Sequence, residues 1–121
     1  MICIEVGGLK LRGQLNDTDC ARAVADALPL QGHFDVWGDE FYFRVPVEHE
    51  LERTAKAEME VGDLGYWPLG NALCIFFGPT PMSGGEKPVA ASPVNLVGSV
   101  EGAELLKGAK GASEITVEAT S

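Results

Sequence analysis

The stretch GDLGYWPLGNALCIFFGPTP, from Gly62 to Pro81, decides most of what the sequence says about the fold. It holds four of the chain's nine aromatic residues and three of its seven prolines, and its one charged residue is Asp63. The turn-rich segment PLGN (68–71) separates two short runs, 64–67 and 73–77, whose composition is typical of β-strands. Successive side chains of a strand point to opposite faces. We therefore expect each strand to bury one member of its aromatic pair and to expose the other.

The two aromatic pairs are Tyr66/Trp67 and Phe76/Phe77. The sequence leaves open which of Tyr66 and Trp67 faces the core. Of the second pair we expect Phe76 inside and Phe77 at the surface. A lone aromatic side chain is most simply a core residue, because its burial contributes roughly 1.5–3 kcal/mol.

The flanking segments mostly alternate with the period of two that is typical of strands. A Gly7-Gly8 pair and a Gly38-Asp39 pair each separate two alternating runs, which predicts hairpins. Between them, apolar residues recur with helical spacing over 20–28, after good N-cap residues at 16–18 and before Pro29. Later segments predict a polar loop (48–59), a long loop (78–93), a strand (94–100), a short helix (101–108) and a last strand (113–119).

This pattern predicts a mainly β protein, namely a closed antiparallel β-barrel of about eight strands with one main helix and one short helix. At 121 residues the chain has the length of one domain, so we expect residues 1–121 to form a single domain.

Composition and charge exclude several classes of function. The net charge is −9 and the nine basic residues are scattered, so we expect no nucleic-acid partner. No apolar run is long enough to span a membrane and the first residues do not form a signal peptide, so we expect a cytoplasmic protein without a membrane partner. Three widely spaced cysteines and two isolated histidines predict free thiols, no metal site and no cofactor; the cysteines are Cys3, Cys20 and Cys74.

Tyr42 and Arg44 are the side chains that stand out as candidates for binding. Alternation in the run 40–47 places Phe41 and Phe43 on one face, and Tyr42 and Arg44 on the other. An exposed pair of arginine and aromatic residues is a common recognition surface. The simpler interpretation is that the arginine stem packs on its aromatic neighbours.

The order of these segments resembles that of the cyclophilins, a family of peptidyl-prolyl cis-trans isomerases with a barrel fold. YFR (42–44) is similar to the FHR-type strand of that family, IFF (75–77) to its FF strand, and NLVGSVEGAELLKG (95–108) to its last strand and short helix. The opening stretch together with VNLVG (94–98) resembles more closely a family of small prokaryotic cyclophilin-like proteins of uncharacterised function.

The resemblance implies an outer groove formed by Tyr42, Arg44 and Phe77. Cyclophilins use an arginine to stabilise the prolyl nitrogen as amide resonance is lost, so Arg44 would be the catalytic residue if the protein is an isomerase. Several groove positions depart from the family pattern: Ile75 stands in place of the glutamine, and 78–93 contains neither tryptophan nor histidine. We therefore expect a cyclophilin-like protein that binds a peptide segment or a small ligand. A weak prolyl isomerase and a structural homo-oligomer subunit are the alternatives.

Overall fold

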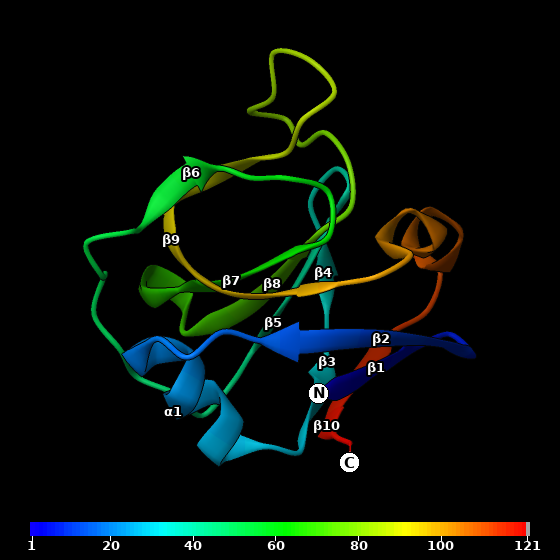
Figure 1. The fold of residues 1–121 in the computed structure, drawn as a ribbon. Coiled ribbons are helices and arrows are strands. Elements are labelled where there is room, and N and C mark those ends of the chain that lie inside the picture. Colours follow the sequence, from blue (N-terminus) through cyan, green and yellow to red (C-terminus); the bar gives the residue numbers. More distant parts are fainter. Residues whose placement is uncertain (121) are drawn as a thin grey trace.

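The computed structural model describes residues 1–120 of the chain (Figure 1). The described part contains one α-helix, ten strands and two short 3₁₀ helices. In chain order these are β1 (Ile2–Val6), β2 (Leu9–Leu15), α1 (Asp19–Ala27), β3 (Leu30–His33), β4 (Asp35–Val36), β5 (Glu40–Arg44), β6 (Lys56–Glu58), β7 (Asp63–Trp67), η1 (Pro68–Gly70), β8 (Ala72–Phe76), β9 (Val89–Val100), η2 (Ala103–Ala109) and β10 (Glu114–Ala119).

All strand pairs are antiparallel, and they form one continuous path through the sheet. The order along the path is β3-β10-β1-β2-β9-β7-β8-β5-β4, with β6 paired to β9 beside it. The 12-residue strand β9 bends strongly, so that its second half pairs with β2 while its first half pairs with β6 (Figure 1). The predicted mainly β, antiparallel character is confirmed.

The prediction of a closed barrel is wrong, because the sheet does not close. Its path ends at β3 and at β4, and no ladder of backbone hydrogen bonds joins these two ends in residues 1–120. Near this gap, β3 and β5 approach each other through a side chain. A Cβ placed on Gly32 of β3 would lie 3.4 Å from the Phe43 ring of β5. Alternation along a strand fixes which side chains share a face, but it does not show whether two edges meet.

The main core lies on the concave side of the sheet and collects one face of most strands. Phe41 and Phe43 of β5, Tyr66 of β7 and Leu73 and Ile75 of β8 are buried there. Tyr66 is fully buried and its hydroxyl donates a hydrogen bond to the Val47 carbonyl. Of the pair left open by the sequence, Tyr66 therefore faces the core, and Trp67 is half-buried on the opposite side.

A second, smaller core covers the other face of β8. Its buried members come from β8, from the first half of β9 and from the segment after β6; they are Met59, Cys74, Phe76, Ala90 and Val94. Phe76 is buried, but in this second core rather than in the main one, so the prediction that it lies inside the barrel is wrong. Two segments expected as loops supply the cover: 48–59 contains β6, and β9 begins at Val89, inside the expected loop 78–93.

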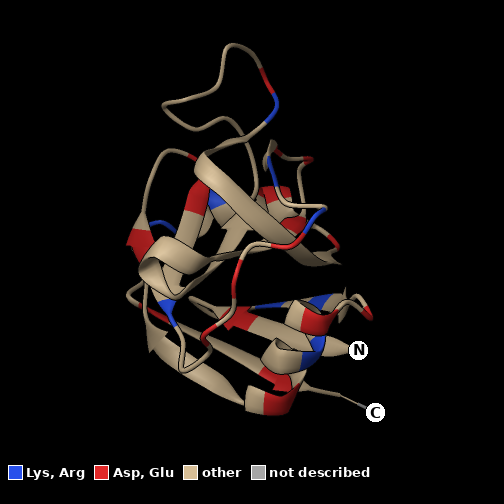
Figure 2. Ribbon diagram, turned by 90° about the vertical axis from the view of Figure 1, so that its left-hand side faces the viewer, with Lys and Arg blue, Asp and Glu red and all other residues tan. Residues whose placement is uncertain are grey.

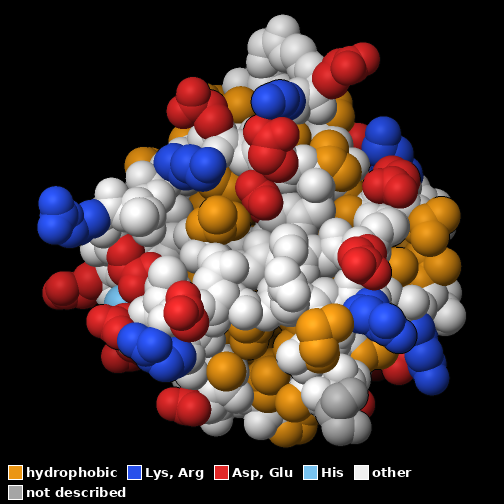
Figure 3. Space-filling view, in the orientation of Figure 1, with side chains coloured by type: hydrophobic (Ala, Val, Ile, Leu, Met, Phe, Trp, Pro, Cys, Tyr) orange, Lys and Arg blue, Asp and Glu red, His pale blue; other side chains and the backbone are white. Residues whose placement is uncertain are grey.

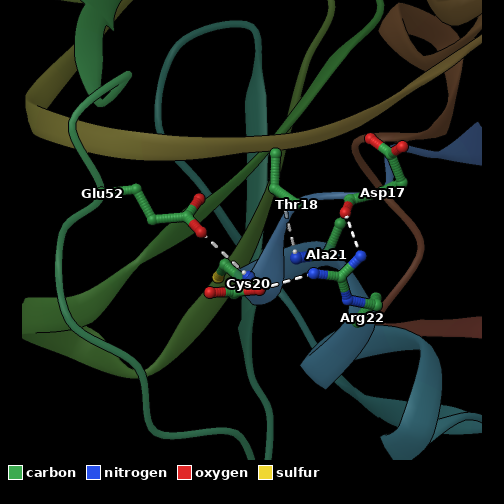
Figure 4. Close-up of polar contacts among 7 residues, drawn as sticks. Asp17, Thr18, Cys20, Ala21, Arg22 and Glu52 are labelled. Carbon is green, nitrogen blue, oxygen red and sulfur yellow. Dashed lines mark hydrogen bonds and ion pairs between the residues drawn. The ribbon is translucent and has the colours of Figure 1, made fainter.

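Helix α1 packs against β2 and β9 and begins with two side-chain caps. The Thr18 hydroxyl accepts a hydrogen bond from the Ala21 N–H at 3.2 Å. Figure 4 shows the Glu52 carboxylate reaching the same end of the helix, where its Oε2 accepts a hydrogen bond from the Cys20 N–H at 3.1 Å. The helix ends at Ala27, before Pro29, as the sequence predicts.

Charges of both signs are interspersed over the surface. Figure 2 shows acidic and basic positions spread over the ribbon, and Figure 3 shows them mixed with apolar side chains on one face. None of the helices within residues 1–120 has the length and apolar character needed to cross a membrane. The three cysteines are free thiols; Cys20 and Cys74 are buried and Cys3 is half-buried.

Candidate functional site

Strand β5 divides its side chains as the sequence predicts. Phe41 and Phe43 enter the main core, whereas Glu40, Tyr42 and Arg44 project to the opposite side. This opposite side is partly roofed by the first half of β9, because β9 crosses β7 closely at Gly65. A Cβ on Gly65 would lie only 2.7 Å from Val94 Cγ2 of β9. A recess therefore forms between β5, β7 and β8 below and β9 above.

This recess, which we call the Glu40 pocket, has a volume of about 160 Å³. That volume has room for several water molecules or for one small organic group. Its lining is mostly aromatic and aliphatic, and both tryptophans of the chain contribute to it. The lining residues are Trp37, Glu40, Tyr42, Trp67, Cys74, Ala90, Ala91 and Val94.

Trp67 is held in place from two sides. Its indole Nε1–H donates a hydrogen bond of 2.7 Å to the Ser92 hydroxyl on β9. A Cβ on Gly70 would lie 2.7 Å from two carbons of the Trp67 ring, so the ring packs directly on the Gly70 backbone. The Tyr42 and Trp67 rings meet edge to face, with centroids 6.4 Å apart and planes at 79°. Tyr42 and Trp67 therefore form one packed wall of the pocket, in which Trp67 is fixed by these contacts.

Glu40 is the one acidic residue of the lining, and it is only 5% exposed. Burial raises the pKa of its carboxyl group from 4.5 to about 7, because the charged form loses water. A hydrogen bond from the Cys74 thiol acts in the opposite direction and lowers this pKa in part. Among the described residues no ion pair to Glu40 is formed. The pocket therefore holds a carboxyl group whose negative charge is not neutralised by the protein.

In contrast to Glu40, the neighbouring carboxylate of Asp39 forms ion pairs. Its Oδ1 lies 2.6 Å from Lys110 Nζ, and its Oδ2 lies 3.8 Å from Lys107 Nζ. Asp39 belongs to the turn between β4 and β5, whereas Glu40 is the first residue of β5 and turns to the other side. Both lysines come from the η2 region, away from the pocket lining.

The other titratable groups of the pocket stay neutral near pH 7. Burial is the largest cause that raises the pKa of the Tyr42 hydroxyl, and the nearby carboxyl groups of Asp35 and Glu40 raise it further. Burial also raises the pKa of the Cys74 thiol well above 9.0, and Glu40 raises it further. Glu40 is thus the lining residue that changes charge close to neutral pH.

The three residues predicted to form one groove lie in three different places. Tyr42 lines the Glu40 pocket. Arg44 is exposed and lines a separate depression of about 490 Å³ with Pro46, Glu48 and their neighbours. Phe77 is 1% exposed and packs in the main core, 4.7 Å from Phe41 between ring centroids.

The placement of Phe77 corrects the expectation that it would lie at the surface. Both faces of β8 and of the residue after it are covered. Phe76 is therefore buried in the second core and Phe77 in the main core. Phe77 therefore shares no surface with Tyr42 or Arg44.

Apart from Tyr42, the sequence did not single out the residues that define the pocket. Glu40 was placed on the correct face of β5, yet nothing local to it showed that the face would be covered. Trp37 lies in the turn before β5, where its N–H donates to the Glu40 carbonyl at 2.9 Å. For Trp67, the sequence left open whether it or Tyr66 faces the core.

Within residues 1–120, no group of three or more His, Cys, Asp and Glu side chains is arranged to hold a metal ion. The pocket's polar groups are a single carboxyl, a phenol, a thiol and two indoles, and the indole N–H of Trp67 already donates to Ser92.

The comparisons with known proteins agree with the architecture. The family model described as Cyclophilin-like matches residues 1–118. The solution structure of the hypothetical protein AF2241 from Archaeoglobus fulgidus is similar, with a TM-score of 0.81 and 36% identity over 98% of this chain and 93% of that chain. Among curated proteins, no significant match to the chain was found. The extent of the family match and the similarity in sequence and fold together show that this chain belongs to the cyclophilin-like family.

Proposed function

We propose that this protein is a binding module that holds a small ligand, or a single side chain of a peptide, in the Glu40 pocket. The observation that supports the proposal is the combination of a packed aromatic wall and one unpaired, buried carboxyl group in a pocket of about 160 Å³. Ligand sites are typically concave, mostly apolar and furnished with a few polar groups of this kind. A carboxyl group with a perturbed pKa in such a pocket is a further mark of a functional site.

The size of the pocket sets the size of the ligand. A recess of about 160 Å³ is smaller than the roughly 300–1,000 Å³ that is usual for drug-sized ligands. It suits a compact group, and the remainder of a larger ligand would lie outside, over the exposed residue Ala91.

The pocket's two tryptophans make the test direct. Each indole N–H gives its own signal in a ¹H–¹⁵N spectrum, and the chain has no others. Small neutral, anionic and cationic fragments are titrated into the labelled protein. We expect a subset to shift both indole signals, and expect Tyr42→Ala to abolish these shifts. Arg44→Ala is the control, because Arg44 lines the separate depression. If no fragment shifts either indole signal, the proposal fails.

The two alternatives from the sequence stay predictions. A weak peptidyl-prolyl isomerase would depend on Arg44. This residue lines a separate depression, which has no lining residue in common with the Glu40 pocket. A structural homo-oligomer would bury exposed apolar side chains, which are scattered as Met1, Val36, Leu51, Val61, Leu69, Met82 and Leu105. Light scattering at high protein concentration tests the second alternative.

A further inference from the structure

We infer that the ligand group taken up by the Glu40 pocket is a methylated ammonium cation, held by Glu40 against the rings of Trp37, Tyr42 and Trp67. This inference rests on the proposed function and adds the chemical class of the ligand. It is carried by the composition of the lining and by the pairing of the nearby charges.

Three of the eight lining residues are aromatic, and they include both tryptophans and one of the two tyrosines of the chain. The electron-rich face of an aromatic ring attracts a cation, and tryptophan does so most strongly. Several rings around one recess form the type of aromatic cage that binds quaternary ammonium groups. The Tyr42 and Trp67 rings are already set at 79° to each other, so they provide two walls of different orientation without rearrangement.

The Glu40 carboxyl group indicates that the ligand carries a positive charge. Glu40 lies at the pocket with no ion pair in the described part of the chain, whereas Asp39 beside it is paired with Lys107 and Lys110. A buried carboxylate without a cationic partner is costly, so a ligand that supplies the positive charge gains free energy from it. An anionic ligand would meet Glu40 as a like charge in a confined space.

The mostly apolar lining favours a methylated ammonium over a primary one. A primary ammonium carries three N–H donors, and each must find an acceptor when it leaves water. The side-chain acceptors in the lining are the Glu40 carboxyl, the Tyr42 hydroxyl and a weakly accepting thiol. A trimethylammonium group has no N–H donor and presents methyl groups, which suit the aliphatic wall of Ala90, Ala91 and Val94.

The charge state of the pocket makes binding depend on pH. The titratable groups that face Glu40 are Tyr42 on its own strand and Cys74 on β8, and the Asp35 carboxyl acts on Tyr42 from β4. The lining residues from β7 and β9 carry no titratable group. Since Tyr42 and Cys74 stay neutral, ionisation of Glu40 is what creates the negative charge. Affinity for the cation should therefore rise as the pH increases through about 7.

Choline and its uncharged isostere 3,3-dimethyl-1-butanol provide the test. The two have the same shape, so calorimetric titration of the whole protein with each measures the contribution of the charge. At pH 8 we expect choline to bind about tenfold more tightly than the isostere. At pH 6 we expect the choline affinity to fall several-fold, while the affinity for the isostere stays unchanged.

The variant Glu40→Gln keeps the shape of the side chain and removes its charge. We expect it to reduce choline affinity at pH 8 about tenfold and to remove the pH dependence. Glu5→Gln is the matched control, because Glu5 is an exposed residue of β1 outside the pocket lining. Circular dichroism verifies that both variants are folded before they are compared.

The possible outcomes separate this inference from the proposed function. If the neutral isostere binds as tightly as choline, the pocket is a ligand site but the cationic class is wrong. If Glu40→Gln and Glu5→Gln bind choline equally, Glu40 does not hold the cation and the inference is overturned. If choline does not shift the two indole signals at all, the inference also fails, and the fragment titration decides whether the proposed function stands.

Discussion

Glu40 and Cys74 both line the Glu40 pocket, and the Cys74 thiol lowers the pKa of the Glu40 carboxyl group less than burial raises it. Tyr42 lies directly opposite Cys74, so Glu40 and Cys74 are diagonal neighbours on β5 and β8. A thiol is a weak donor, and it compensates a buried carboxylate much less than a lysine would. This relationship leaves the pocket with a carboxyl group that is poised between its neutral and charged forms.

The first prediction concerns stability and pH. The folded-state pKa of Glu40 is raised from 4.5 to about 7, so the folded protein holds a proton that the unfolded chain has already lost in this range. Stability is therefore lost as the pH rises from about 4.5 through 7. Above pH 7 the loss reaches on the order of 3 kcal/mol, at about 1.4 kcal/mol for each unit of pKa shift.

Glu40→Gln removes this penalty. In urea unfolding we expect the variant to gain stability relative to the native protein on going from pH 5 to pH 8, whereas Glu5→Gln shows no such change. A difference between Glu40→Gln and the native protein that is the same at both values of pH would contradict the assignment of the pKa.

A second prediction concerns the position of Trp67. Because its ring packs on the Gly70 backbone, Gly70→Ala would place a methyl group 2.7 Å from two ring carbons. A rigid ring must then move, and we expect the indole signal of Trp67 to shift and choline affinity to fall on the order of tenfold, or about 1.4 kcal/mol. Gly108→Ala is the control, since no atom lies within 4 Å of the added methyl. Unchanged binding in Gly70→Ala would show that the orientation of Trp67 is unimportant.

A third prediction concerns the start of α1. Glu52 comes from a segment far along the chain, yet its Oε2 accepts from the Cys20 N–H at 3.1 Å and places a negative charge near the helix N-terminus. Glu52→Ala should destabilise the protein by about 1 kcal/mol through the loss of this cap. Glu50→Ala, at an exposed position two residues earlier, should have little effect. Equal unfolding midpoints for the two variants would show that the contact contributes no stability.

A fourth prediction concerns isomerase activity. Arg44 lies outside the Glu40 pocket, and Phe77, which was expected beside it, is buried in the main core. If the protein is a binding module without catalysis, prolyl peptides should isomerise at the uncatalysed rate in a protease-coupled assay. Arg44→Ala should leave this rate unchanged. A rate above background that Arg44→Ala removes would instead favour the prolyl isomerase.

The sequence was informative where a local pattern decides the structure. Alternation identified the inner and outer faces of β5, the N-cap residues and Pro29 bounded α1, and the stretch 62–81 indicated the family. The prediction that Phe76, and not Phe77, lies inside the barrel was wrong, because Phe77 enters the main core and Phe76 the second core.

The predictions that were wrong share a physical cause. Segments distant in the sequence pack over faces and edges that the local pattern does not describe. Residues 89–93 were taken for loop, but they extend β9 over β7 and β8 and so help to create both the second core and the Glu40 pocket. The burial of Glu40 depends on this cover, whereas Phe77 is buried by packing against Phe41 in the main core. The open edges of the sheet likewise depend on how the ends of the strand path approach each other, which alternation cannot reveal.

The central claim is that the Glu40 carboxylate pairs with a cation inside an aromatic pocket, and the pKa of Glu40 tests it most directly. ¹³C NMR of the carboxyl group, with Glu40→Gln used to assign its signal, gives this pKa with and without saturating choline. The account predicts a pKa of about 7 in the free protein and a fall toward the ordinary value of 4.5 when choline is bound, because the cation stabilises the charged form. A pKa that choline leaves unchanged would contradict the account.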